Sequence, residues 1–474
     1  MSKYLYGASV QGIQNFIFKT NKLKEIIGAS KLVEDLGFIR GIIENNKKAR
    51  DTYSVEGIKN KPIVILSSAG NLRIIFENKE DAKIMVKKFP KEVMQKAYGI
   101  TISQALIPFD DTYERCSKKL EQRLKFQRNK PPLPLDLHFS ILKQNPKTAK
   151  PVVKKIIEED EEIYLDKATK QKIDRFKQFV NEKLDLENLS NSKNKIAIIH
   201  ADGNGLGKIV QNMDEKELKS FSLALDKATI GAKEEASKVV KGFEKNHREI
   251  ILSGDDLTIV CNASYALEFT RNFLELFEQK TKNIYKNDSL SACAGIAYAN
   301  EKYPLHYAFD LAEALCSYAK KDSRKIDDKY PPSSLMFHNI RSSHVKSYSK
   351  FVDDELTLGT DEKILCNFGS YFLHEYKDRP QIDVLLKTID DFRKDGSPIS
   401  RLREWLSELD NNRTYADNEL KRINQITTWK SENLSNLYKN LSLENLIVTK
   451  DGAEKTPIYD ILQILAVEDK GDKK

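Results

Sequence analysis

Apolar residues along the first hundred positions of the chain follow two different spacings. Alternating or continuous apolar runs predict strands at 3–10, 62–76 and 99–107, and the second run is long enough for a hairpin. Apolar residues at helical spacing predict helices at 26–43 and 80–98. The resulting order of strand, helix, hairpin, helix and strand is that of a ferredoxin-like domain.

The same order returns between residues 195 and 340. The expected elements are a strand at 196–199, a helix at 214–244, a hairpin at 249–261, a helix at 265–284, a strand at 290–299 and a helix at 304–320. An edge strand at 334–339 is expected to follow, and it makes His338 an edge side chain rather than a ligand. The predicted fold class is therefore α+β, with two ferredoxin-like domains.

The remaining segments have mainly helical patterns. A basic helix is expected at 110–130, a break at Pro131 to Pro134, and a charged helical connection at 154–194. The region 345–467 is expected to be all helical, with one helix at 361–376. The predicted domains are a first repeat at 1–108, a helical linker at 109–194, a second repeat at 195–343 and a C-terminal helical domain at 344–474.

Composition places the chain among globular proteins. It has 474 residues, of which 40% are hydrophobic and 31% charged. No apolar run approaches the length of a membrane span, and the N-terminus has no apolar signal region, so we expect a cytoplasmic protein that does not enter a membrane. The net charge of +8 permits nucleotide or nucleic-acid partners without requiring them. Five cysteines without a Cys-x-x-Cys pair predict neither a disulfide framework nor a zinc ribbon.

Two consecutive acids mark the candidate chemistry of the second repeat. Asp255 and Asp256 follow Ser253 and Gly254 at the tip of the predicted hairpin. Mg²⁺ prefers oxygen ligands and often bridges carboxylates to phosphates, so a pair of exposed acids on a rigid hairpin suits it. Asp and Gly are also common turn residues, and this stretch alone is more often a plain hairpin.

The stretch HADGNGLG at 200–207 favours a metal site over a plain hairpin turn. Asp202 follows the predicted strand at 196–199, and a glycine-rich turn follows the acid. Backbone N–H groups of such a turn can cradle phosphate. Neighbouring strands would bring Asp202 and Asp255 to one edge of the sheet, as in a two-metal site for phosphoryl or nucleotidyl transfer. The direction of the His200 side chain cannot be determined from alternation, and we assign it no role.

In its motifs, residues 195–340 resemble the nucleotidyl cyclase palm domain. That domain is shared by GGDEF-type cyclases and the large palm-containing subunit of type III CRISPR effector complexes. HADGNGLG stands at the family's first metal motif, SGDD at 253–256 stands in place of GGDD, and LSACAGIAYA at 290–299 precedes a helix ending in Ala-Lys. The first repeat resembles that subunit's first palm through SVQGIQNFI at 9–17 and Gly-Ala-Ser at 28–30. Ser253 departs from the family's glycine but needs only a tolerable backbone angle, so we expect activity to be retained.

The resemblance implies a nucleotidyltransferase that makes a cyclic oligonucleotide messenger, such as cyclic oligoadenylate, from ATP in antiviral defence. Asp202, Asp255 and Asp256 would be catalytic and, with the carbonyl of Gly203, would hold two Mg²⁺ or Mn²⁺ ions. The nucleotide-binding residues would be Gly203, Asn204, Gly205, Leu206, Gly207, Ser253, Gly254, Lys320 and Ser30. A solvated helix end explains Lys320 equally well, and helix-on-sheet packing explains Ser30 at least as well.

Several further expectations follow from the same resemblance. The first repeat has no acid at its hairpin tip, 67–71, and is expected to be non-catalytic. Guide or target RNA and other effector subunits are the implied partners, through the first palm and the C-terminal helices, and a homo-oligomer stays open. The place of the family's zinc insertion, 142–151, has no cysteine, so we expect no zinc. The chain starts at the first palm, so we expect no N-terminal HD nuclease domain.

Two other classes of function stay open at this point. A non-catalytic palm-fold scaffold or RNA-binding subunit would share the fold, although retention of all three acids and the glycine turn favours the enzyme. A template-dependent polymerase would share the carboxylates, but it needs a thumb and a primer groove, and the sequence gives no clear sign of either.

Overall fold

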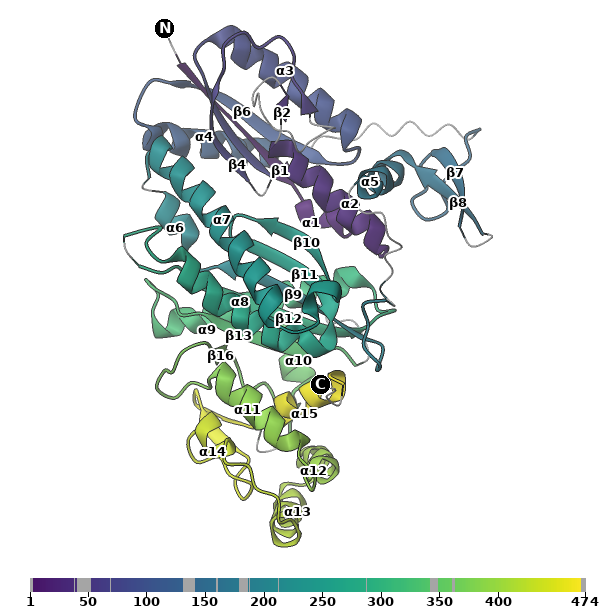
Figure 1. Cartoon of the computed structure of the whole chain (residues 1–474), viewed down its shortest axis with the longest axis vertical. Coiled ribbons are helices and arrows are strands. Elements are labelled where there is room, and N and C mark those ends of the chain that lie inside the picture. The colour runs from purple at the N-terminus through teal and green to yellow at the C-terminus, as the bar shows by residue number, and fades with distance from the viewer. Residues whose placement is uncertain are drawn as a thin grey trace. The chain divides into compact units, whose positions relative to one another are not determined.

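A computed structural model of the chain describes residues 3–37, 39–40, 53–68, 70–130, 141–158, 161–178, 186, 188–211, 213–286, 288–341, 348–359 and 363–469. The chain forms two compact units (Figure 1). The first unit consists of residues 1–185 and 206–226, and the second consists of residues 186–205 and 227–474. Within the described part of the chain, no helix is both long and apolar enough to span a membrane.

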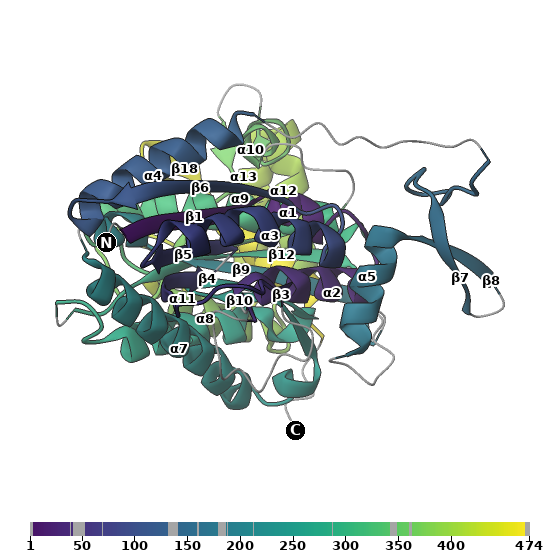
Figure 2. The same ribbon diagram turned by 90° about the horizontal axis from the view of Figure 1, so that it is seen from above.

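The first unit is built on an antiparallel sheet of order β4-β5-β1-β6 (Figure 2). Its strands are β1 (Lys3–Gln11), β4 (Ile63–Ser68), β5 (Asn71–Phe76) and β6 (Thr101–Phe109). The expected order of the first repeat is confirmed by the helices α1 (Ile13–Ile17), α2 (Leu23–Glu34) and α3 (Lys79–Lys96) and by a two-residue pair, β2 (Ile39–Arg40) with β3 (Tyr53–Ser54). Asn78 caps α3, because its side chain accepts a hydrogen bond from the Asp81 N–H at 2.8 Å.

The connection after the first repeat is not purely helical as predicted. A helix α4 (Tyr113–Arg128) is followed by a hairpin of β7 (Val152–Glu158) and β8 (Glu161–Asp166), and then by α5 (Lys167–Lys177). The expectation of a helix over 154–166 is therefore wrong. The break predicted at 131–134 lies outside the described residues.

Helices α2 and α5 lie side by side and pack closely (Figures 1 and 2). A Cβ atom at Gly28 would meet the carbonyl oxygen of Lys172 at 1.9 Å, so only glycine allows this approach. A buried ion pair of 2.5 Å joins Arg175 to Asp35 beside the contact. Burial is the main cause that raises the Asp35 pKa to about 6, and the Arg175 charge opposes it.

The second unit contains a six-stranded sheet of order β10-β11-β9-β12-β13-β16. Its strands are β9 (Lys195–Gly203), β10 (His247–Ser253), β11 (Asp256–Asn262), β12 (Ala292–Asn300), β13 (Ser334–Asn339) and β16 (Tyr371–Phe372). The helices that accompany them are α7 (Glu215–Val239), of which residues 227–239 belong to this unit, α8 (Ala266–Thr281) and α9 (Leu305–Ile326).

The outer side of this sheet differs from the prediction. Strand β13 pairs with β12 on one side and with β16 on the other, so it is not an edge strand. His338 is accordingly buried, and burial lowers the pKa of its imidazole to about 4. It is a core side chain rather than an edge one.

The two repeats share a strand order and also a local irregularity. Each places its first strand in the middle, its hairpin on one side and its last strand on the other. Both hairpins have a register shift at the same place, between Val64 and Leu66 in β4 and between Glu249 and Ile251 in β10. The shared bulge allows residues of the two repeats to be matched one to one.

The C-terminal part of the second unit is mixed rather than all helical. Its helices are α10 (Tyr348–Glu355), α11 (Ile382–Arg393), α12 (Ile399–Asn411), α13 (Arg413–Ile426), α14 (Leu434–Leu437) and α15 (Ile458–Val467). They surround a small sheet of β14 (Thr357–Leu358), β15 (Ile364–Leu365), β18 (Ala453–Lys455) and β17 (Val448–Lys450). The helix expected at 361–376 is replaced by β15, β16 and loops in its described part. Trp405 of α12 is fully buried.

Candidate functional site

The hairpin of β10 and β11 ends in a two-residue loop that carries the first acid. Ser253 pairs with Asp256 as the last rung of the ladder, so Gly254 and Asp255 form the loop. Gly254 has a φ of 65°, in the left-handed region that favours glycine. Its carbonyl accepts a hydrogen bond of 2.6 Å from the buried Thr229 hydroxyl of α7. This hydrogen bond from α7 therefore fixes the position of the loop.

Asp202 lies at the end of β9, the strand next to β11. The ladder pairs Ala201 with Leu257, and continuing this register by one residue puts Asp202 opposite Asp256. Asp202 and Asp255 share a hydrogen bond between their side chains. The structure thus brings together the acids that lie on two separate motifs of the sequence.

The electrostatics of the cluster favour binding of a cation. Burial is the largest cause that raises the pKa of Asp255 to about 7, followed by the charge of Asp202 and the hydrogen bond to it. Burial also raises the pKa of Asp256 well above its ordinary value, and the charges of Asp202 and Asp255 add to this. Because the ionised forms of Asp255 and Asp256 are disfavoured, a positive charge placed beside them would stabilise the cluster.

Asp256 has an oxygen without a hydrogen-bond donor. Its Oδ1 is buried and has no hydrogen-bond partner among the described residues. The nearest basic atom is Nδ1 of His200 at 3.5 Å, and this nitrogen is also 3.1 Å from the Thr258 hydroxyl. Burial lowers the pKa of His200, so the ring is neutral at physiological pH and adds no positive charge to the cluster.

Lys320 contributes the positive charge at this end of the sheet. It lies in α9, and its Nζ is 2.5 Å from Oδ2 of Asp202 and 2.7 Å from the carbonyl oxygen of Gly203. The Lys320 side chain is mostly covered, with 16% exposed, whereas that of Asp202 is 41% exposed. Lys320 is therefore part of the carboxylate cluster and not a solvated helix end.

The glycine-rich turn offers fewer free N–H groups than the sequence predicts. The N–H of Asn204 donates to the Ser291 carbonyl at 2.9 Å, and its side-chain amide donates to the Ser291 hydroxyl at 3.0 Å. The Asn204 backbone N–H is thus already paired within the protein, and nucleotide binding by Asn204 stays a prediction. Gly205 has a φ of 68° and an open space where a Cβ would be, and Leu206 and Gly207 begin α6 (Leu206–Val210).

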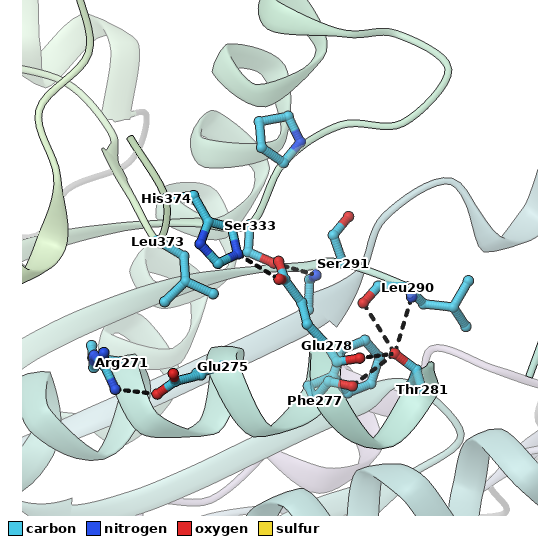
Figure 3. A network of polar contacts seen from close by, with 12 residues as sticks. Arg271, Glu275, Phe277, Glu278, Thr281, Leu290, Ser291, Ser333, Leu373 and His374 are labelled. Carbon is cyan, nitrogen blue, oxygen red and sulfur yellow. Dashed lines mark hydrogen bonds and ion pairs between the residues drawn. The ribbon is translucent and has the colours of Figure 1, made fainter. Parts of the chain in front are cut away.

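Ser291 is itself fixed by the loop that precedes β12 (Figure 3). The Thr281 hydroxyl at the end of α8 exchanges hydrogen bonds with the N–H and the carbonyl of Leu290, at 3.0 and 3.1 Å. On the other side, the Ser333 hydroxyl accepts a hydrogen bond of 3.1 Å from the N–H of Ala292. These contacts place Ser291 and, through it, the turn that follows Asp202. No local sequence signal identifies Thr281 or Ser291 as supporting residues.

The first unit contains Ser30 and also the positions that match the three acids of the second repeat. Ser30 is buried in α2, two residues after the close packing contact at Gly28, which fits the packing interpretation. In β1 and β5, Ser9 pairs with Asn71, the pair that matches Asp202 and Asp256 of the second repeat. The first repeat therefore has no carboxylate at these two positions, and Gly70 occupies the loop place of Asp255.

The donors present fit a hard divalent cation only in part. Asp202, Asp255 and the orphaned oxygen of Asp256 supply oxygen atoms of the kind that Mg²⁺ and Mn²⁺ prefer, together with the Gly203 carbonyl. Among the described residues, however, no group of three or more His, Cys, Asp or Glu side chains is arranged to hold a metal ion. The chemistry of the donors therefore fits the ion, whereas the arrangement of the described side chains does not form a metal centre.

Comparison with known proteins identifies the second repeat. The sequence pattern of the second palm domain of Cas10/Cmr2 matches residues 195–327, which run from the start of β9 to just past the end of α9. Residues 195–327 therefore resemble the second palm domain of that family. The first repeat has the same strand order, so the α+β fold with two palms that the sequence predicts is confirmed. No curated protein sequence matches the chain.

Solved structures resemble this chain along almost its whole length. The Csm1–Csm4 cassette in complex with cA4 has a TM-score of 0.57 at 14% identity, covering 98% of this chain and 70% of the other. The same cassette with pppApA has a TM-score of 0.57 at 14% identity, covering 99% and 70%. With one ATP the values are 0.57 and 15%, again covering 99% and 70%. At such identities the likeness shows a shared fold.

Proposed function

We propose that this chain is a metal-dependent nucleotidyltransferase that makes a cyclic oligonucleotide, such as cyclic oligoadenylate, from ATP. The observation that carries the proposal is the cluster of Asp202, Asp255 and Asp256 with Lys320 at one end of the second palm. Structures of similar fold have been solved with ATP, pppApA and cA4, which are the substrate class, intermediate class and product class of such a reaction.

The reaction joins the 3′-oxygen of one nucleotide to the α-phosphorus of another. A new P–O bond forms, the bond from the α-phosphorus to pyrophosphate breaks, and the hydroxyl proton is lost to solvent or a carboxylate. Divalent ions bound by these carboxylates would favour the ionised hydroxyl and neutralise the leaving pyrophosphate.

The residues of the chain have distinct parts in this proposal. Asp202, Asp255 and Asp256 supply the oxygen donors, and the Gly203 carbonyl adds one more. Lys320 lies beside Asp202 and provides a positive charge for the triphosphate. Thr229 holds the Gly254 carbonyl and so fixes the loop that carries Asp255. These elements are anchored by the central strands, which suits a site that must keep its geometry through the reaction.

A non-catalytic scaffold is the second candidate, and one observation favours it. The ammonium of Lys320 already neutralises Asp202, and no three acids of the described chain are arranged around an ion site. In this reading the palm keeps its fold to bind other subunits of an effector complex, as the Csm1–Csm4 cassettes of similar fold bind theirs. The two candidates differ in whether ATP and metal bind at the cluster.

The test of the enzyme is a product assay. The purified chain would be incubated with each of the four radiolabelled nucleoside triphosphates and Mg²⁺ or Mn²⁺, with and without single-stranded RNA as an activator. Mass spectrometry would identify the products, and Asp255→Ala with Asp256→Ala would be the inactive control. A cyclic product lost in the double variant supports the enzyme. Absence of product together with absence of ATP binding supports the scaffold.

A further inference from the structure

A groove of about 860 Å³ follows the outer strand of the first palm sheet. Its floor is residues 104–108 of β6, and its walls are Val86 of α3 on one face and α4 on the other. The Gln104 side chain fixes the first wall, because it donates to the Val86 carbonyl at 3.0 Å and accepts from the Tyr6 hydroxyl at 2.9 Å. Figure 2 shows β6 beside β1, with α4 alongside.

Strand β6 has no strand partner on its outer side within the described part of the chain. An unpaired strand edge exposes a row of N–H and C=O groups that can pair with another chain. Pro108 near the end of β6 has no N–H, which is the usual way in which proline is tolerated on an edge. The edge therefore keeps its capacity for pairing along the residues before Pro108.

The second palm shows which element fits this position. Ser9 pairs with Ser103 in the first palm, and its match Asp202 pairs with Cys293 in the second. Residues 103–108 of β6 therefore correspond to 293–298 of β12. In the second palm that stretch of β12 is paired along its outer side with β13, which runs parallel to it from Ser334 to Asn339.

The match also shows what pairing Pro108 permits. Pro108 corresponds to Tyr298, whose carbonyl accepts a hydrogen bond of 2.9 Å from the N–H of Ile340 just after β13. Proline retains a carbonyl, so the equivalent bond can form at the first palm. A parallel strand of about six residues would thus fit the β6 edge. It would lose only one hydrogen bond, because Pro108 has no N–H to donate.

The basic side chains on the α4 wall of the groove favour an acidic strand. Lys119 and Arg123 line the groove and are exposed. The acids close to them in sequence pair with other residues, Asp111 with Arg115, Glu114 with Lys118 and Glu121 with Arg73. Phe126, which is 58% exposed, adds an apolar surface at the same wall.

We propose that the β6 edge of the first palm binds an extended, acidic, proline-free segment of a partner protein as an added parallel strand. Backbone pairing would give affinity, and acids facing Lys119 and Arg123 with an apolar residue facing Phe126 would give specificity. Nucleic acid fits less well, because the floor is a strand edge rather than a stacking surface. Asp110 also lines the groove, where the two basic side chains Lys119 and Arg123 outnumber it. The proposal is independent of nucleotide chemistry at Asp202.

The test uses the full chain and a displayed library of random peptides of about strand length. Peptides retained by the wild-type chain would be counter-selected against a Lys119→Glu plus Arg123→Glu variant. The matched control is Lys118→Glu plus Lys125→Glu, which reverses two exposed charges of the same helix outside the groove. Hydrogen–deuterium exchange with the enriched peptide would locate the binding site, and labelled oligouridylate would be the nucleic-acid probe.

The expected result is a set of acidic, proline-free peptides that protect the amides of β6. We expect their affinity to fall about tenfold or more in the Lys119/Arg123 variant and to stay within about twofold in the control. The proposal is overturned if no peptide is enriched, if protection lies away from β6, or if both double variants weaken binding equally. It is also overturned if oligouridylate protects β6 and the peptides do not.

Discussion

The carboxylate cluster should destabilise the protein when no cation is bound. Asp255 has its pKa raised from the ordinary 3.8 to about 7, so its ionised form is disfavoured in the folded chain. At pH values between 3.8 and about 7, the Asp255 carboxyl has lost its proton in the unfolded chain but still holds it in the folded chain. Stability therefore decreases as pH rises through this window and reaches its full loss above pH of about 7. Replacing the carboxyl with an amide should remove this loss.

The structure sets the size of the effect. A shift from 3.8 to about 7 corresponds to about 4 kcal/mol, at about 1.36 kcal/mol for each unit. Asp255 is half-buried rather than enclosed, so solvent screening reduces this to about 2 kcal/mol. Asp255→Asn should then raise the melting temperature of the second unit by about 5 °C at about pH 8. At about pH 5 roughly one third of the gain should remain, because little of the window has been crossed.

The assay is thermal unfolding with a metal chelator and then with Mg²⁺, for wild type, Asp255→Asn and Asp395→Asn. Asp395 is an exposed acid in a turn, so its variant is the matched control. Without metal, only Asp255→Asn should gain stability, and more at the higher pH. With Mg²⁺, only wild type and the control should be stabilised further. A gain that does not depend on pH, or a loss at about pH 8, would refute the electrostatic account.

Three further predictions concern other parts of the chain. Lys320→Met should weaken binding of an ATP analogue about tenfold to a hundredfold by calorimetry, because a charge-assisted contact is lost, whereas exposed Lys321→Met should not. Gly28→Ala should lower the free energy of unfolding of the first unit by about 1–3 kcal/mol, measured with urea, because the new Cβ would overlap the Lys172 carbonyl. An unchanged urea midpoint would show instead that α2 and α5 can separate freely. Asp460→Asn should stabilise the second unit more at about pH 8 than at about pH 5, because burial raises the pKa of this carboxyl to about 7; an equal effect at both pH values would contradict that shift.

The repeated palm fold could be predicted because its signals are local. Each palm element is long enough to show a clear apolar spacing, and the order of elements then indicates the topology. The two acid motifs were also predictable, because a strand followed by Asp202 and a hairpin carrying Asp255 are visible in the sequence. Their meeting follows from the pairing of β9 with β11.

Other elements could not be predicted because their stabilising contacts are distant or their faces are not distinct. The β7–β8 hairpin is charged on both sides, and Ile157 in it is 69% exposed, so its strands lack the alternation of a half-buried strand. The C-terminal sheet has strands of two or three residues, which are too short for a period to be recognised. Strand β13 is not an edge strand because it pairs with β16, which lies more than thirty residues later in the chain.

Details of the site were hidden for the same reason. The N–H of Asn204 is unavailable to phosphate because Ser291, in the loop before β12, accepts its hydrogen bond. His200 lies within β9, and the sequence did not reveal the direction of its side chain, which the structure turns toward Thr258 and Asp256. Such contacts depend on pairing between segments far apart in the chain and leave no pattern in either segment alone.

Metal binding at the cluster tests the central claim most directly, because it does not depend on an unknown activator. Mn²⁺ would be titrated into the chain with a non-hydrolysable ATP analogue, and bound ions would be counted by electron paramagnetic resonance. We predict that Mn²⁺ and the analogue bind together to wild type and that Asp202→Asn or Asp255→Asn abolishes this binding. Binding that is unchanged in both variants, or absent from wild type, would contradict the assignment of these carboxylates to a nucleotidyltransferase site.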